Sequence, residues 1–185
     1  YTDSSKNKAV IMQNVFKQGD AYFNTGDLVR DIGFRHAQFI DRLGDTFRWK
    51  GENVSTTQVE NIVSDYEKIA NAVVYGVEVP HTNGRAGMVA ITLAEHCSLT
   101  EQDLSNMLTH FKAELPSYAV PLFIRVQEQV ETTGTFKYLK NKLKTQGFNI
   151  YETNERILVL LPGQKSYCDL TPELYENIQA YKYRF

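Results

Sequence analysis

The chain has 185 residues, of which 42% are hydrophobic, so it can bury a core as one domain, or as one domain with a piece of another. Its formal net charge of -2 gives no electrostatic basis for binding nucleic acid. No apolar run has the length of a membrane span, and the first residues do not form a signal peptide. The two cysteines, Cys97 and Cys168, are too few for a disulfide framework. Together these features predict a cytoplasmic protein with two free thiols.

The first forty residues predict one helix and three strands. Apolar residues between Val10 and Phe16 have helical spacing and predict a helix that leads into a strand. Two strand-like runs, 27–31 and 34–40, are separated by Gly33. This arrangement predicts a hairpin.

Three further helices have clear start signals. Ser55, with a glutamine three residues later, fits a capping box and predicts a helix over about 56–66. Thr100 predicts the start of a second helix, which ends before Pro116. Thr171, followed by a proline, predicts the start of a last helix.

Strand-like runs alternate with these helices, at 72–79, 88–93 and 122–126. The order predicts an α+β fold, in which helices flank a short sheet of about three strands.

One continuous block, from Thr25 to Glu60, combines two turns rich in acid and glycine with a strand-like run and a helix cap. Its uninterrupted run from Asp41 to Thr57 is its most specific part, and the run 133–137, Thr-Gly-Thr-Phe-Lys, follows much later. In order and spacing these segments resemble the adenylate-forming (AMP-binding) enzyme superfamily, and within it the fatty acid transport protein and very-long-chain acyl-CoA synthetase group. The resemblance covers about residues 16–148 and becomes weak in the tail.

The resemblance implies the organisation of the chain. It implies that 1–43 is the end of a large N-terminal AMP-binding domain whose remainder is missing here, and that 44–150 is the small C-terminal lid domain. Residues 151–185 are then an extension with a final helix. The implied activity is that of a long- or very-long-chain fatty acid-CoA ligase, which uses ATP to form an acyl-adenylate and then transfers the acyl group to CoA. We expect the fragment alone to be inactive, any Mg²⁺ to be held with ATP by the missing domain, and the enzyme to contact a membrane surface peripherally.

Lys137 lies where a Thr/Gly turn passes into a helix that contains Leu139 and Leu143. From the residues alone, this lysine reads as part of a solvated helix face with Lys140, Lys142 and Lys144, or as a cation that can reach an incoming anion. The resemblance favours the second interpretation, because a lysine at this place contacts the carboxylate and the α-phosphate during adenylation. The usual Gly-Lys pair is here Phe136-Lys137, as in the transport-protein group.

Asp27 and Arg42 are the residues that the resemblance assigns to the nucleotide. The carboxylate of Asp27 is suited to accept hydrogen bonds from both ribose hydroxyls, and the guanidinium of Arg42 suits ribose or phosphate oxygens. The alternatives are a turn aspartate that caps its own backbone and a surface ion pair of Arg42 with Asp41 or Asp45.

Gly44 occupies the position of the superfamily's hinge, about which the small domain rotates between the two half-reactions, although many relatives carry Asp or Lys there. An ordinary Gly-Asp turn is the alternative. The resemblance implies a loop that would line the passage for the pantetheine arm of CoA, and this loop contains Arg48, Lys50 and Gly51. Trp49 lies on the same loop, but it fits a packing anchor at least as well as a CoA contact.

The four histidines, His36, His81, His96 and His110, have no metal-ligand spacing, so we predict no metal site within the chain. Two rival functions remain at this point: another adenylate-forming ligase, which loads a carrier protein, and a non-enzymatic interaction module. Whether the full-length enzyme depends on CoA or on a carrier protein distinguishes the fatty acid-CoA ligase from the first rival. The length of the natural reading frame upstream of Tyr1 tests the second rival.

Overall fold

The structure is a computed structural model that describes residues 10–42, 46–128 and 136–185. The chain divides into two compact units, Tyr1–Gly44 and Asp45–Phe185. The division falls after Gly44, whereas the predicted domain boundary falls after residue 43. The tail from residue 151 belongs to the second unit.

The described part of the first unit consists of two antiparallel hairpins. Strand β1 (Ile11–Gln13) pairs with β2 (Ala21–Phe23), and β3 (Asp27–Gly33) pairs with β4 (His36–Arg42). The predicted β3–β4 hairpin is therefore confirmed, with its turn at Phe34 and Arg35.

The helix predicted between Val10 and Phe16 is wrong, because these residues enter the β1–β2 hairpin. The carboxylate of Asp20 accepts hydrogen bonds from the backbone N–H groups of Val15, Phe16 and Lys17, at 2.8 to 3.0 Å. A side chain that captures backbone donors in this way offers the chain an alternative to helical hydrogen bonds.

The second unit is built around a mixed sheet in the order β11-β10-β9-β8-β7. Strands β8 and β9 are parallel, and the other neighbours are antiparallel. The strands are β7 (Ile69–Val77), β8 (Ala86–Leu93), β9 (Phe123–Gln127), β10 (Arg156–Val159) and β11 (Cys168–Asp169).

The three predicted strands correspond to β7, β8 and β9, but the sheet has five strands and not about three. The tail supplies the other two: β10 pairs with β9, and β11 pairs with β10. The partner of β10 is far away in sequence, and no local turn signal announces that pairing.

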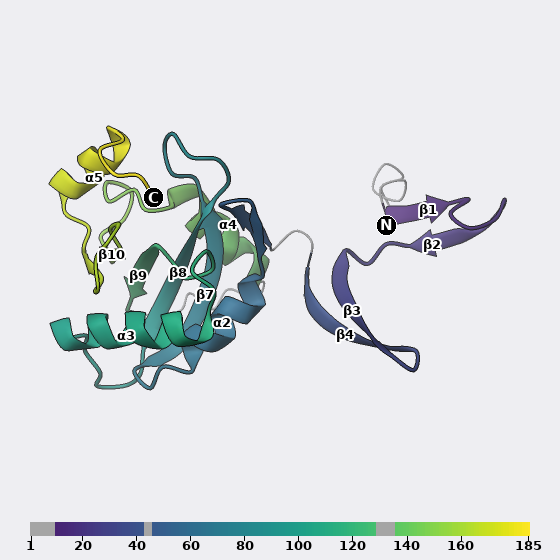
Figure 1. Ribbon diagram of the computed structural model, residues 1–185, viewed down its shortest axis with the longest axis horizontal. Helices are drawn as coiled ribbons and strands as arrows, with labels where there is room; N and C mark the ends of the chain where they lie inside the picture. The colour runs from purple at the N-terminus through teal and green to yellow at the C-terminus, as the bar shows by residue number, and fades with distance from the viewer. Residues whose placement is uncertain (1–9, 43–45, 129–135) are drawn as a thin grey trace. The chain divides into compact units, whose positions relative to one another are not determined.

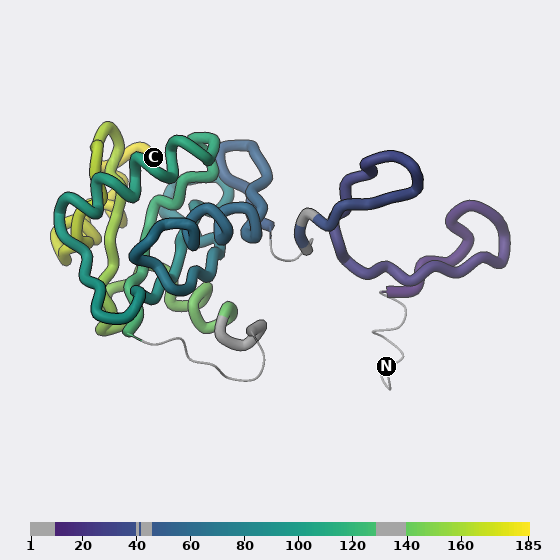
Figure 2. Tube along the Cα trace, turned by 90° about the horizontal axis from the view of Figure 1, so that it is seen from below, coloured from purple at the N-terminus to yellow at the C-terminus, as the bar shows by residue number. Residues whose placement is uncertain are grey.

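Four helices lie in the described part of this unit: α2 (Thr56–Ser64), α3 (Glu101–Glu114), α4 (Phe136–Gln146) and α5 (Pro172–Gln179). The predicted caps are confirmed, since the side chains of Ser55, Thr100 and Thr171 accept hydrogen bonds from the first turns of α2, α3 and α5. The α+β prediction is likewise confirmed. In Figures 1 and 2, α3 covers one face of the sheet beside α2, and α4 lies against the other face.

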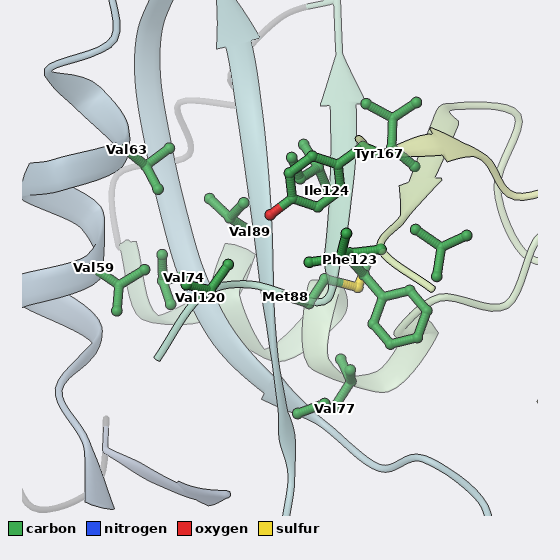
Figure 3. Close-up of a cluster of buried hydrophobic side chains, with 14 of the residues drawn as sticks. Val59, Val63, Val74, Val77, Met88, Val89, Val120, Phe123, Ile124 and Tyr167 are labelled. Atoms are coloured by element: carbon green, nitrogen blue, oxygen red, sulfur yellow. The ribbon is translucent and has the colours of Figure 1, made fainter. Parts of the chain in front are cut away.

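Strand alternation gives the sheet two apolar faces, as buried side chains from both sides confirm. On one face, Val59 and Val63 of α2 point toward Val74 and Val89 of the sheet (Figure 3). On the other face, the ring of Phe123 on β9 stacks on the ring of Phe148, which follows α4 in the chain. The two ring centroids are 4.3 Å apart. The sheet therefore packs against helices on both of its faces.

The tail is tied into this core by its aromatic residues. Tyr167 is buried, donates its hydroxyl hydrogen to the carbonyl oxygen of Pro121 at 2.7 Å, and contacts the ring of Phe111 on α3. Tyr175 on α5 packs edge-on against Phe148. None of the helices in the described residues is long and apolar enough to cross a membrane.

Candidate functional site

The β3–β4 hairpin places two predicted site residues opposite one another. Asp27 is the first residue of β3 and Arg42 the last of β4, and the two are register partners. The next pair along the ladder joins Leu28 to Asp41. Backbone pairing therefore brings a carboxylate and a guanidinium position together, as the assignment of both residues to one nucleotide requires.

The turn before Asp27 fixes how the chain enters β3. Thr25 Oγ1 accepts a hydrogen bond from the Asp27 N–H at 3.2 Å, and Asn24 Oδ1 accepts one from the Gly26 N–H at 2.9 Å. Two of the backbone donors of this turn are thus satisfied by Asn24 and Thr25.

Asp41, on β4 of this hairpin, was not among the predicted nucleotide-binding residues. It is only 2% exposed, whereas most of the hairpin is exposed. A buried carboxylate next to Arg42 in the chain is costly to leave without compensation. Its register partner on β3, Leu28, is 41% exposed, so the pairing of the two strands gave no signal for this burial.

A second hairpin carries the residues predicted for the CoA passage. Strand β5 (Phe47–Trp49) pairs with β6 (Glu52–Val54), and Lys50 and Gly51 form the two-residue turn between them. Both turn residues have positive φ, 51° and 87°, as a tight hairpin turn requires. The turn itself is exposed, so its backbone is accessible to a ligand.

The side chains of this turn are held by local contacts. Arg48 Nε donates a hydrogen bond to the carbonyl oxygen of Gly51 at 3.1 Å, and Lys50 Nζ lies 6.0 Å from the centroid of the Trp49 ring. Trp49 is 3% exposed, so the tryptophan is a packing anchor, the alternative considered for it. Two cationic side chains, Arg48 and Lys50, remain exposed beside it.

The β5–β6 hairpin is docked on the segment that joins β7 to β8. The Arg85 N–H donates to the carbonyl oxygen of Arg48 at 2.7 Å, and Trp49 forms an isolated bridge with Gly84. Gly84 has φ +90°, and a Cβ there would lie 2.2 Å from the carbonyl oxygen of Arg48. Only glycine permits this approach, so the position of the hairpin depends on Gly84.

A surface cavity of about 1030 Å³ lies next to this docking point. Its wall is formed by residues 76–85 and 144–149, with Tyr175 and Gln179 from α5. Among the described residues, no predicted site residue lines the cavity, although Gly84 and Arg85 belong both to its wall and to the support of the hairpin.

Lys137 is the second residue of α4, in the first turn of that helix. The predicted helix at this lysine is thus confirmed, and the predicted turn before it lies outside the described residues. The predicted hinge residue, Gly44, lies outside the described residues.

The sequence did not reveal how α4 is held. Lys140 Nζ lies 3.3 Å from Thr56 Oγ1 and 3.3 Å from Glu60 Oε1, both on α2. The Lys140 side chain is 16% exposed, so it does not belong to a solvated face of α4. A cation and an anion far apart in sequence carry no pattern that identifies them as a pair.

No group of three or more His, Cys, Asp or Glu side chains within residues 10–42, 46–128 and 136–185 is placed to hold a metal ion. The cysteines, Cys97 and Cys168, are both free.

Comparison with known proteins identifies related chains. Residues 58–137 match the family described as AMP-binding enzyme C-terminal domain. The chain is 44% identical over 173 residues to the long-chain fatty acid transport protein 6 of Mus musculus, a match that covers 94% of this chain and 28% of that protein. It is 41% identical over 178 residues to a medium/long-chain fatty acid-CoA ligase of Mycobacterium tuberculosis, covering 96% of this chain and 29% of that protein. The chain thus spans less than a third of the length of these relatives.

Solved structures agree on the fold. The o-succinylbenzoate CoA synthetase of Bacillus subtilis, in complex with its acyl-adenylate intermediate, has a TM-score of 0.62 at 24% identity and covers 78% of this chain and 27% of that chain. The coronafacic acid ligase of Pectobacterium brasiliense has a TM-score of 0.61 at 21% identity, with 76% of this chain and 26% of that chain covered.

Proposed function

The chain belongs to the AMP-binding enzyme C-terminal domain family, and we propose that it is the C-terminal part of an ATP-dependent ligase that joins long- or very-long-chain fatty acids to CoA. The observation that carries this proposal is the extent of the likeness: identities of 41% and 44% run over more than nine-tenths of the chain, well beyond the matched segment 58–137. The proposed substrates are a fatty acid, ATP and CoA. The preference for chain length rests on the names of the relatives, since no residue here is assigned to the acyl tail.

In the first half-reaction, a carboxylate oxygen of the fatty acid bonds to the α-phosphorus of ATP while the bond from that phosphorus to the bridging oxygen breaks and pyrophosphate leaves. Two anions must meet, and negative charge builds up in the transition state. We assign to Lys137 the role of placing an ammonium between them, which stabilises that charge and orients the carboxylate. Its place in the first turn of α4 supports this role.

Asp27 and Arg42 would hold the nucleotide. The carboxylate accepts hydrogen bonds from the ribose hydroxyls, and the guanidinium donates to ribose or phosphate oxygens. Their pairing in the β3–β4 register supports a shared ligand. Mg²⁺ bound together with ATP belongs to the same proposal, with its ligands in a part of the enzyme that this chain does not include.

In the second half-reaction, the CoA sulfur bonds to the acyl carbon, the bond from that carbon to the AMP oxygen breaks, and the thiol gives up its proton. We assign the passage for the pantetheine arm to the β5–β6 turn, where Gly51 exposes the backbone and Arg48 and Lys50 present positive charge. Gly44 is the proposed hinge between the two half-reactions. Location in the cytoplasm, with peripheral contact to a membrane, stays a prediction from the sequence.

The test of this function uses the intact ligase that carries this chain and its Lys137→Ala variant. Adenylation is followed as fatty-acid-dependent exchange of pyrophosphate into ATP, and thioester formation as the reaction of preformed acyl-adenylate with CoA. We expect Lys137→Ala to slow adenylation by at least about a hundredfold, in the range found when one stabilising donor is removed, and to leave thioester formation at its original rate.

Equal losses in both half-reactions would refute the role of Lys137. An intact enzyme that consumes no ATP with a fatty acid, or that passes the acyl group only to a carrier protein and not to CoA, would refute the proposed function itself.

A further inference from the structure

One carboxylate oxygen connects three elements near the start of α4. Glu60 lies on α2, and its Oε1 accepts a hydrogen bond from the Val74 N–H of β7 at 2.8 Å. Among the described strands, β7 is the last of the sheet, so one side of its backbone has no neighbouring strand there. Glu60 satisfies a donor on that side and attaches α2 to the sheet edge.

The same oxygen receives Lys140 from α4. The distance from Lys140 Nζ to Glu60 Oε1 is 3.3 Å, and a second hydrogen bond at 3.3 Å reaches Thr56 Oγ1. The side chains of Lys140 and Glu60 are 16% and 26% exposed, and Thr56 is buried. Because the pair is largely shielded from water, removal of either partner leaves a charge that solvent compensates poorly.

The contact lies one helical turn from Lys137. Residues three apart in a helix are neighbours on its surface, so a constraint at Lys140 acts on the turn that contains Lys137. The last turn of α4 is fixed separately, because Gln146 Oε1 accepts a hydrogen bond from Arg125 Nη2 at 2.9 Å and Leu143 is buried. Arg125 is buried in the sheet, so the two anchors together fix the helix along its axis and in its rotation.

We propose that Lys140 and Glu60 are positioning residues for adenylation: their ion pair locks the first turn of α4 to α2 and to the edge of β7, and so holds Lys137 where it meets the reacting anions. This inference rests on the proposed function of Lys137. In this proposal, neither Lys140 nor Glu60 contacts the substrate. The benefit is geometric, since a displacement of a catalytic group by about 1 Å costs up to about a hundredfold in rate.

The test measures both half-reactions of the intact ligase. Lys140→Met removes the cation with little change in side-chain length, and Glu60→Gln removes the charge but keeps an oxygen for the Val74 N–H. We expect Lys140→Met to slow adenylation by about tenfold, within the range of measured pair couplings, and Glu60→Gln to have a smaller effect in the same direction. Thioester formation from preformed acyl-adenylate keeps its original rate, and Lys140→Arg restores most of the adenylation rate.

Two exposed residues provide matched controls: Lys142→Met on α4 and Glu67→Gln after α2. We expect both control variants to keep the original rates of adenylation and thioester formation. Thermal unfolding of each variant of the 185-residue chain shows whether a loss of rate follows a loss of folded protein.

A further pair of variants separates this inference from the proposed function. If Lys140 acts through Lys137, then Lys140→Met added to Lys137→Ala lowers adenylation no further than Lys137→Ala alone. A Lys137→Ala enzyme with normal adenylation refutes the proposed function. The positioning role alone is refuted if Lys137→Ala impairs adenylation but Lys140→Met and Glu60→Gln do not. It is also refuted if Lys137→Ala impairs adenylation and these two variants slow both half-reactions equally.

Discussion

Asp27 and Arg42 face one another at the open end of the β3–β4 hairpin, as the pair of residues furthest from its turn. The hairpin turn at Phe34 and Arg35 and the strand register are sufficient to create this pair. The two strands of one hairpin therefore bring these two proposed nucleotide-binding residues opposite each other without a further element.

We predict that loss of either side chain weakens ATP binding. Asp27→Asn removes the charge from hydrogen bonds to the ribose, and a hydrogen bond to a charged group contributes about 1.5–3 kcal/mol, so KM for ATP is expected to rise by about tenfold or more. Arg42→Lys loses the planar fork of donors and is expected to act in the same direction. Arg30→Lys, an exposed change on β3, is the control. Steady-state kinetics of the intact ligase with ATP varied provide the measurement, and an unchanged KM in both variants contradicts the assignment.

Gly84 gives a prediction for the docking of the β5–β6 hairpin. Gly84→Ala puts a Cβ 2.2 Å from the Arg48 carbonyl oxygen in a backbone conformation with φ +90°. Gly163→Ala is matched for conformation, with φ +79°, but its Cβ meets nothing within 4 Å. We expect about 1 kcal/mol of destabilisation from strain at Gly163 and about 2 kcal/mol more at Gly84, where the hairpin must also move.

Urea unfolding of the 185-residue chain measures both free energies of unfolding. In the intact ligase, Gly84→Ala is also expected to slow thioester formation, because the proposed CoA passage is displaced. Equal free energies for the two variants would show that contact with Arg48 does not restrict position 84.

Gly44→Pro tests the proposed hinge. Proline fixes φ near -65° and removes the flexibility that a rotation between two states requires. We expect the variant of the intact ligase to lose more of the thioester step than of adenylation. Gly163→Pro, at an exposed glycine away from the proposed hinge, is the control for a general effect on folding. If Gly44→Pro leaves the rates of adenylation and thioester formation unchanged, then the hinge is not at Gly44.

Asp103 provides a prediction for the dependence of stability on pH. Its side chain accepts hydrogen bonds from Lys68 Nζ at 2.8 Å and from the Thr100 hydroxyl at 2.6 Å. The hydrogen bond from Lys68, followed by those from Thr100, lowers the pKa of Asp103 below its usual range. Because the folded pKa lies below the unfolded value of about 3.9, this stabilisation is complete above about pH 5 and is lost as the pH falls.

We therefore expect Asp103→Asn to destabilise the 185-residue chain at about pH 6 and to flatten the fall in its free energy of unfolding between about pH 5 and 3. Urea unfolding at several pH values gives both quantities. Glu67→Gln is the control, since Glu67 is exposed. If the pH dependence of the Asp103→Asn chain equals that of the original chain, then Asp103 does not contribute in this way.

The sequence by itself determined those features that depend on neighbouring residues. The caps at Ser55, Thr100 and Thr171 each act on a backbone group three residues away, so composition and spacing are enough to locate the helices. The β3–β4 hairpin also has a local cause, in its turn. The motif runs that indicate the family are likewise continuous segments.

Tertiary structure alone decided the features that join distant parts of the chain. Strand β10 enters the sheet because β9 offers it an edge, and local apolar character does not specify that partner. The β1–β2 hairpin replaced a predicted helix because the Asp20 side chain captures backbone donors that a helix needs. The pairing of Lys140 with Glu60 spans 80 residues, and only the packing of α2 and α4 against the sheet brings the two charges within 3.3 Å. Local spacing fixes where an element begins, but long-range packing fixes which side chains meet.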